Sequence, residues 1–427
     1  MYRILCGFIG ICGLTIPMEG WAQHLPGHFG DPVLIEVEDW ISAIRIGSTS
    51  SGELLVTWDD VENLKGRRLD VDRKIQGEIF NLPSLPLALL PLPDSCLLPK
   101  GLVAAWASEG TLGSDEDQSI QYRLFDDKDI PLNTENQANT FIAGSQAYPA
   151  VHCHNDGFKI TWTDTRLDQV MFRSFDAQGQ PEHVETAISE TTGSILFGSS
   201  VATARNGTSL VVWTGRDVTG GDLNVSIQGR LIGTNGVPVS SQFQVNTYTT
   251  GSQQEPSVAA TPNGDFLVVW KSQGSLGTDQ DGFSVQAKLI RSGGNLGGSE
   301  FQINQMEKFS QGVPFAAVGS EGLSLVVWEN THSDLEQIVG RFLREDDPAG
   351  PEFVIADADA LAHPHITADG RGNFAVAWAE RLGFVRDWLF IQIFRGSEAN
   401  IFIDGFESGN LDLWSSSTST NQEGDGG

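Results

Sequence analysis

The chain has 427 residues, of which 40% are hydrophobic and 19% are charged, and its formal net charge at pH 7 is −29. This acidity argues against nucleic acid as a partner, because binding to phosphates needs clustered Lys and Arg side chains. It also argues against anionic membrane surfaces, and it suits an exported protein or one that takes up divalent cations.

Residues 1–22 have the pattern of a secretory signal peptide. Arg3 supplies the positive charge, residues 4–17 form an apolar stretch, and residues 20–22 match a small-x-small cleavage site. The apolar stretch is short for a transmembrane helix, and no later segment is a better candidate. We therefore expect a secreted or periplasmic protein without membrane insertion, in which residues 23–30 form a short leader.

The chain from residue 31 to residue 396 is built from a repeat of about 50 residues. Its clearest copy is Pro256 to Asn304, which contains four short strand-like runs and one tryptophan. The equivalent tryptophans are Trp58, Trp106, Trp162, Trp213, Trp270, Trp328 and Trp378. Four strands per unit at this period indicate propeller blades, so the sequence predicts an all-β, seven-bladed β-propeller with the tryptophans in its core.

The two ends of the repeat are incomplete in complementary ways. The first strand-like run, Pro32 to Glu38, matches the last strand of a unit rather than the first. The seventh unit has strands near residues 364–368, 374–378 and 387–395 but no outer strand of its own. The N-terminal strand can supply it, which would close the ring and leave no sheet edge open.

Aspartates recur in the glycine-rich loops that follow the tryptophan strands. Asp115 and Asp117 lie nine and eleven residues after one tryptophan, and Asp279 and Asp281 lie at the same distances after another. These loops and the blade-to-blade connections are long and share one face, which is the predicted binding face. Asp-x-Asp can bind Ca²⁺ through its oxygens, so calcium is the candidate cofactor, with solvated turn aspartates as the alternative.

Cys96 and Cys153 are the two cysteines that follow the predicted signal peptide. Aligning the inner hairpins by their turn glycines places the two residues on the innermost strands of neighbouring blades, with opposite side-chain parity. In an oxidising compartment this placement predicts a disulfide between the blades. Two buried free thiols are the alternative.

Two His-x-His pairs also lie on inner strands, at His152 and His154 and at His363 and His365. Two imidazoles on one strand face can share a metal ion, but the pairs belong to distant blades. The alternative is that the histidines are packed or line the channel.

One basic residue recurs near the end of each third strand. We expect each to pair with an acid across a strand, and a ring of bases that binds anions is the alternative. These residues are Arg68, Arg123, Arg173, Arg230, Lys288, Arg341 and Arg395.

Two stretches resemble known families. The run QFQVNTYTTGSQQEPSVAATPNGDFLVVWKS from Gln242 resembles a repeat of secreted bacterial proteins described as extracellular and propeller-like. The run IFIDGFESGNLDLWS from Ile401 is similar to a short tail that ends many exported Gram-negative proteins. Both resemblances imply export, and neither implies an activity. Residues 397–427 are therefore predicted to form a C-terminal tail, with a disordered end.

Neither a Gly-x-Ser-x-Gly nor a His-Glu-x-x-His motif is present. We therefore expect a monomeric, non-enzymatic propeller that binds an extracellular protein or glycan through its long-loop face, in adhesion or recognition. The alternative is a polysaccharide-acting enzyme, a glycosidase or lyase, with carboxylates at the channel mouth. An enzyme would need carboxylates that converge on one pocket, whereas a binding module would carry dispersed acids beside an aromatic or apolar patch.

Overall fold

The computed structural model describes most of the repeat region. It covers residues 31–37, 41–59, 63–83, 93–108, 117–154, 156–190, 195–216, 224–293, 298–308, 310–332, 335–344, 347–358, 361–382 and 386–396. The predicted signal peptide, the leader and the C-terminal tail lie outside the described residues.

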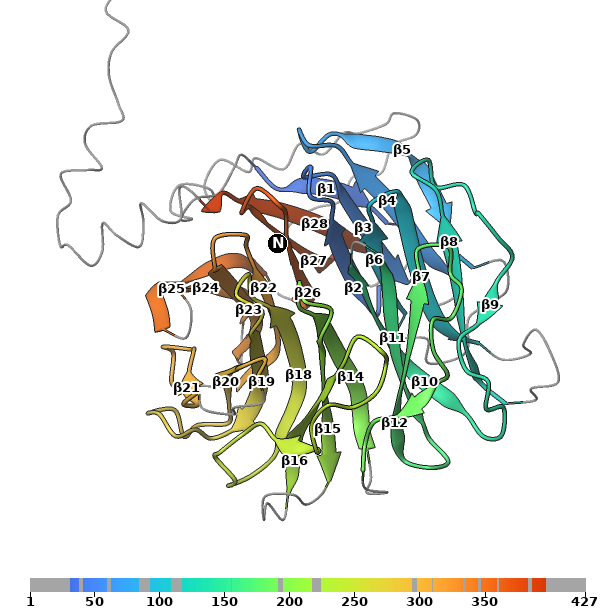
Figure 1. The fold of residues 1–427 in the computed structure, drawn as a ribbon. Coiled ribbons are helices and arrows are strands. Elements are labelled where there is room, and N and C mark those ends of the chain that lie inside the picture. Colours follow the sequence, from blue (N-terminus) through green and yellow to red (C-terminus); the bar gives the residue numbers. More distant parts are fainter. Residues whose placement is uncertain are drawn as a thin grey trace, which may run out of the picture.

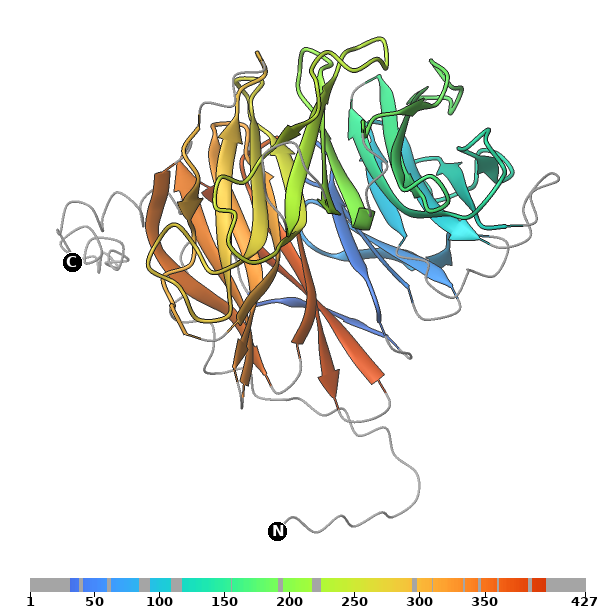
Figure 2. The same cartoon turned by 90° about the horizontal axis from the view of Figure 1, so that it is seen from below.

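The described residues form seven four-stranded antiparallel sheets. In Figure 1 the sheets follow one another around a central axis, and the last strands, in red, lie beside the first strand, in blue. Figure 2 shows the ring turned by 90°, with the strands running between its two faces. The predicted seven-bladed β-propeller is confirmed.

Each blade takes its strands in chain order from the channel outward. The first blade contains β2 (Ile44–Ser48), β3 (Leu54–Asp59), β4 (Leu64–Leu69) and β5 (Ile75–Asn81), and the second contains β6 (Asp94–Leu98), β7 (Gly101–Ser108), β8 (Ser119–Phe125) and β9 (Asn136–Gln137). The third contains β10 (Gln146–His154), β11 (Gly157–Asp164), β12 (Gln169–Asp176) and β13 (Thr186–Ala187), and the fourth contains β14 (Ile195–Thr203), β15 (Ser209–Arg216), β16 (Val225–Ile232) and β17 (Phe243–Gln244). The fifth contains β18 (Gln253–Ala260), β19 (Phe266–Gln273), β20 (Phe283–Ile290) and β21 (Phe301–Gln302), and the sixth contains β22 (Ser310–Val318), β23 (Leu323–His332), β24 (Leu335–Arg344) and β25 (Asp347–Ala358).

The seventh blade is closed by the N-terminal strand, as predicted. It contains β26 (Leu361–Ala368), β27 (Phe374–Leu382) and β28 (Arg386–Phe394), and its outer strand is β1 (Val33–Glu36). β1 runs antiparallel to β28, with Ile35 opposite Leu389. Ile35 is only 3% exposed, so apolar burial as well as backbone hydrogen bonding holds the two ends of the repeat together.

The seven repeat tryptophans lie in the core, and each is 0–3% exposed. They contribute to the contacts between blades as well as within them, because both faces of each sheet are covered by neighbouring blades. Trp58 of the first blade, for example, belongs to the same apolar cluster as Ala377 of the seventh. Burial of both sheet faces explains why successive residues of the tryptophan strands are apolar rather than alternating.

The recurring bases join adjacent blades, and the prediction that acids are their partners holds for only part of the set. Five of them donate a hydrogen bond to a backbone carbonyl just after the outer strand of the preceding blade: Arg123 to Leu82, Arg173 to Ala138, Arg230 to Ile188, Lys288 to Val245 and Arg341 to Ile303. Ion pairs form at Arg68, with Asp129, and at Arg230, with Glu190. Each long side chain spans the gap between blades and satisfies a carbonyl there.

Beside three of these contacts, a carboxylate accepts the next backbone N–H groups of the preceding blade. Glu300, at the start of the EFQIN run, accepts hydrogen bonds from the backbone nitrogens of Thr247 and Tyr248 and from the Thr247 hydroxyl. Equivalent contacts join Glu185 to Thr140 and Phe141, and Glu352 to Gln305 and Met306. The glutamate of this repeat therefore has a structural role, because it satisfies backbone donors of the blade connection.

Candidate functional site at the channel mouth

The innermost strands of all seven blades line a central cavity of about 770 Å³. This volume lies within the range of roughly 300–1,000 Å³ that is usual for small-molecule sites. The lining is mixed, with serines from several blades, two histidines, the aromatic rings of Tyr148 and Phe315, and the side chains of Arg45, Asp94 and Glu255.

Three innermost strands share one backbone irregularity near the long-loop face. Tyr148, Glu255 and Val313 each precede a proline, and their φ angles are 56°, 54° and 48°. Each lies at a break in the register between the innermost strand and the tryptophan strand. Such φ values are uncommon for residues other than glycine, and a bulge turns side chains toward a new direction. All three residues line the cavity, so the bulges shape its mouth.

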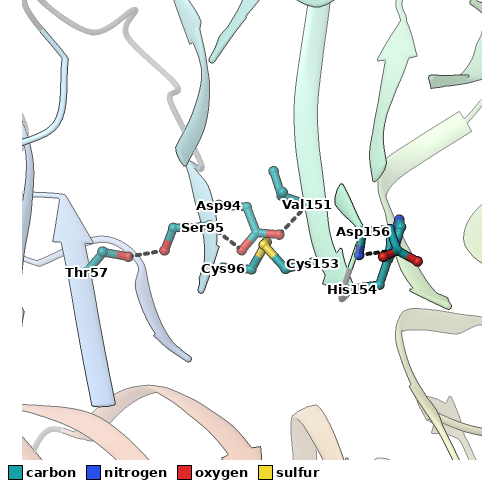
Figure 3. The surroundings of a disulfide bond; sticks show 8 residues. All are labelled: Thr57, Asp94, Ser95, Cys96, Val151, Cys153, His154 and Asp156. Atoms are coloured by element: carbon teal, nitrogen blue, oxygen red, sulfur yellow. Dashed lines mark hydrogen bonds between the residues drawn. A yellow bond between two sulfur atoms is a disulfide. The ribbon is translucent and has the colours of Figure 1, made fainter. Parts of the chain in front are cut away.

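Asp94 connects three blades from inside the channel. Its carboxylate accepts a hydrogen bond from Arg45 Nε of the first blade at 2.9 Å. It also accepts one from the backbone nitrogen of Val151 of the third blade at 2.7 Å (Figure 3). Burial raises the pKa of the Asp94 carboxyl, whereas Arg45 and the backbone donors lower it. The Arg45 guanidinium also lies over the Phe315 ring, 5.9 Å from its centroid.

Cys96 and Cys153 form a disulfide between the second and third blades, with their Cα atoms 5.6 Å apart (Figure 3). The hairpin alignment predicts this pairing. Both cysteines pack against an apolar cluster that contains residues of the two blades they join, and both also line the channel. The disulfide therefore lies beside the Asp94 contacts and crosses the same blade junction.

His152 and His365 line the channel from the third and seventh blades. The backbone nitrogen of Ile46 donates to Nδ1 of His365 at 3.2 Å. Burial lowers the pKa of His152 to about 4 and lowers that of His365 well below its usual value, so both rings are neutral at pH 7. The side chain of His363 lies outside the described residues. Within the part of the chain that the structure describes, no three His, Cys, Asp or Glu side chains are grouped to hold a metal ion.

The loop aspartates that suggested calcium lie in different environments. Asp279 is 1% exposed, and its carboxylate accepts hydrogen bonds from Asn304 Nδ2 at 2.7 Å and from the backbone nitrogen of Asp281 at 3.0 Å. Asp281 itself is exposed. Asp117 accepts a hydrogen bond from the backbone nitrogen of Gly144, and Asp115 lies outside the described residues. Calcium binding in these loops stays a prediction.

The residues at the channel mouth were not singled out in the sequence. The recurring X-Pro pairs of the inner strands could have indicated these positions, because Tyr148, Glu255 and Val313 each lie at the same distance before the turn glycine of their hairpin. The pair of Arg45 and Asp94 gave no such signal, since the two residues are 49 positions apart in different blades.

No protein-family model and no curated protein matches this chain, but many solved structures share its fold. An ulvan lyase of a polysaccharide lyase family matches with a TM-score of 0.55 and 8% identity, over 87% of this chain and 100% of the lyase. The α-L-arabinofuranosidase Arb93A from Fusarium graminearum matches with a TM-score of 0.51 and 13% identity, over 88% and 99% of the two chains. A puromycin hydrolase matches with a TM-score of 0.51 and 12% identity, over 83% and 53%.

At these identities the likeness establishes the propeller fold and no activity. The described residues contain no helix long and apolar enough to cross a membrane.

Proposed function

We propose that this protein is a secreted, non-enzymatic recognition propeller that binds the end of an extracellular glycan at the long-loop mouth of its central channel. The observation that carries the proposal is the set of three bulged positions, Tyr148, Glu255 and Val313, around one cavity. Backbone strain that recurs at one opening is characteristic of binding sites.

The shape and lining of the cavity favour a glycan. Its volume of about 770 Å³ admits a few sugar rings but not a folded protein surface. Tyr148 offers a ring face and a hydroxyl, and Ser199 and Ser257 add hydroxyl groups from two other blades. A few placed polar groups within a concave site are the usual means of orienting a small ligand.

The two carboxylates that line the cavity both have cationic partners, which favours binding over catalysis. Asp94 pairs with Arg45, and Glu255 Oε2 lies 3.5 Å from Lys271 Nζ. A glycosidase or a lyase needs acid and base groups that are available to the substrate. The presence of both carboxylates in one cavity is nevertheless the observation that keeps the enzyme as the second candidate.

The proposal is tested by a glycan array and a polysaccharide-degradation screen on the purified protein, run with calcium and with a chelator. We expect binding without product, and we expect Tyr148→Ala and Glu255→Gln to weaken it at least tenfold. Phe141→Ala is the matched control, because Phe141 is 39% exposed outside the channel. Release of reducing ends would support the enzyme instead. Binding that survives both channel substitutions would place the ligand elsewhere and overturn the proposal.

A further inference from the structure

One level of the central channel is built from the same register position of all seven blades. At this position a residue of the innermost strand lies opposite the residue that precedes the repeat tryptophan, as Ser257 lies opposite Val269 in the fifth blade. The level lies two residues further into the channel than the bulged positions of the mouth. We call it the channel layer, and all of its residues line the cavity: Arg45, Asp94, Ala150, Ser200, Ser257, Phe315 and His365.

The channel layer has a half with small side chains and a half with large ones. The third, fourth and fifth blades contribute Ala150, Ser200 and Ser257. The sixth, seventh, first and second blades contribute Phe315, His365, Arg45 and Asp94. These four blades are consecutive because the ring closes between the seventh and the first. A ligand that lies against the small side chains therefore faces the aromatic and ionisable ones.

Arg45 is held from three directions and still has N–H groups for a ligand. Its Nε donates to Asp94 at 2.9 Å and its Nη1 donates to the carbonyl of Ile44 at 2.8 Å, while the guanidinium lies over the Phe315 ring. Among the described residues Nη2 has no acceptor, and this atom is not buried. The side chain is 23% exposed, so the N–H groups of Nη2 can be reached from the channel that Arg45 lines.

His365 supplies a second donor from the neighbouring blade. The backbone nitrogen of Ile46 donates to its Nδ1 at 3.2 Å, so the neutral ring carries its proton on Nε2. The ring packs against Phe315 with the centroids 4.7 Å apart. No residue in the described part of the chain accepts from Nε2, which is not buried either. Arg45 and His365 therefore present donors beside one aromatic ring.

The carboxylate beside these donors is already in use. Oδ1 of Asp94 accepts from Arg45 Nε and from the backbone nitrogen of Ser95, and Oδ2 accepts from the backbone nitrogen of Val151. A sugar hydroxyl both donates and accepts, whereas a carboxylate only accepts. Two donors beside an occupied acceptor therefore match a carboxylate better than a hydroxyl, and charge-assisted hydrogen bonds are the stronger ones.

We propose that Arg45 and His365 select a glycan whose terminal sugar is a uronic acid, with its carboxylate bound by Arg45 Nη2 and His365 Nε2. This inference rests on the glycan site proposed above and names the class of its ligand. The bond to Asp94 fixes the guanidinium before the ligand arrives, which lowers the cost of ordering it on binding. The net charge of −29 does not decide recognition here, because charges more than about 8 Å away are largely screened at physiological salt.

The test is calorimetric titration of the purified protein with trisaccharides that end in glucuronic, galacturonic or mannuronic acid. Each is compared with the trisaccharide that ends in the corresponding hexose. We expect at least one acidic trisaccharide to bind, and its hexose counterpart to bind at least tenfold more weakly.

Two conservative variants assign the selectivity to the channel layer. Arg45→Lys keeps a positive charge beside Asp94 but removes the planar set of N–H groups, and His365→Asn keeps an acceptor near Nδ1 but removes the Nε2 donor. Each should weaken binding of the acidic trisaccharide at least tenfold, leave that of the hexose counterpart within about twofold, and keep the wild-type Tm. Arg166→Lys is the matched control, because Arg166 is exposed on the long-loop face, where it lies over Phe141 outside the cavity. It should keep the wild-type Kd.

Failure of this inference can be told apart from failure of the glycan site. Equal affinity for acidic and hexose trisaccharides, or wild-type affinity of both variants for the acidic one, would overturn the inference alone if Tyr148→Ala still abolishes binding. Binding of neutral glycans only would do the same. Absence of binding to any glycan would overturn the proposed function and this inference with it.

Discussion

The disulfide between the second and third blades allows a quantitative prediction for the double variant Cys96→Ser/Cys153→Ser. The two cysteines are 57 positions apart in sequence, so the bridge restricts a long loop of the unfolded chain. For a loop of this length the chain-entropy relation gives a loss of about 4 kcal/mol in the free energy of unfolding when the bridge is removed.

The structure indicates that the native junction survives without the bridge. The hydrogen bond from Val151 to Asp94 crosses the same junction, and apolar residues of both blades pack around the cysteines. Serine is close to cysteine in size, and both positions border the channel, where a hydroxyl meets water. The loss should therefore come chiefly from the unfolded state, as the chain-entropy relation assumes.

The measurement is urea unfolding of the wild type and the double variant, followed by tryptophan fluorescence. Wild type kept in reductant is the second arm and should match the double variant. We expect a lower midpoint with similar slopes, which would show that stability rather than compactness has changed. A difference below about 1 kcal/mol, or free thiols on both cysteines of the unreduced protein, would refute the reasoning.

Three further predictions concern the ring closure, the blade contacts and pH. Ile35→Ala should lower the free energy of unfolding by about 2–4 kcal/mol because it leaves a cavity at the closing strand, whereas Ile79→Ala, on an exposed outer strand, should change it by less than about 0.5 kcal/mol. Glu300→Ala should lower the free energy of unfolding by about 2–3 kcal/mol, because the backbone nitrogens of Thr247 and Tyr248 lose a charged acceptor. A decrease as small as that of Ile79→Ala would show that this contact does not stabilise the fold. Burial lowers the pKa of His152 in the folded protein to about 4, whereas in the unfolded chain its pKa is about 6.5. As the pH falls, His152 is therefore protonated first in the unfolded chain, so the free energy of unfolding should decrease between about pH 6.5 and pH 4. We expect a decrease of about 2 kcal/mol after allowance for the exposure of His152 to the channel. His152→Gln should reduce that pH dependence in urea titrations, and an unchanged slope would contradict the assignment.

Much of the fold could be predicted because the same pattern of strand and turn residues recurs seven times along the chain. Most tryptophan strands carry apolar residues on both faces, and six of the seven inner hairpins place a glycine at a positive φ, as at Gly264 with φ 90°. The missing outer strand of the seventh blade and the unmatched first strand together indicated closure. The cysteine pair followed from the same alignment, because aligned repeats show which strand of its blade each residue occupies and which side of that strand it lies on.

The partners of the recurring bases could not be predicted in the same way. Cross-strand pairing is a rule for residues of one sheet, whereas Arg173 reaches the carbonyl of Ala138 in the preceding blade. A backbone carbonyl has no sequence signature, because every residue carries one. Only the packing of one blade against the next shows which carbonyls lack a partner in their own sheet.

The sequence by itself determined the seven-bladed architecture, its closure and the cysteine pair, since all three depend on periodicity along the chain. Tertiary structure alone decided where charges from distant repeats meet. The pairing of Arg45 with Asp94 in the channel, and that of Arg68 with Asp129 between the first two blades, join residues of different blades that no local pattern connects. The physical reason is that the repeat specifies backbone positions, whereas the side chains that vary between repeats interact only after the ring has formed.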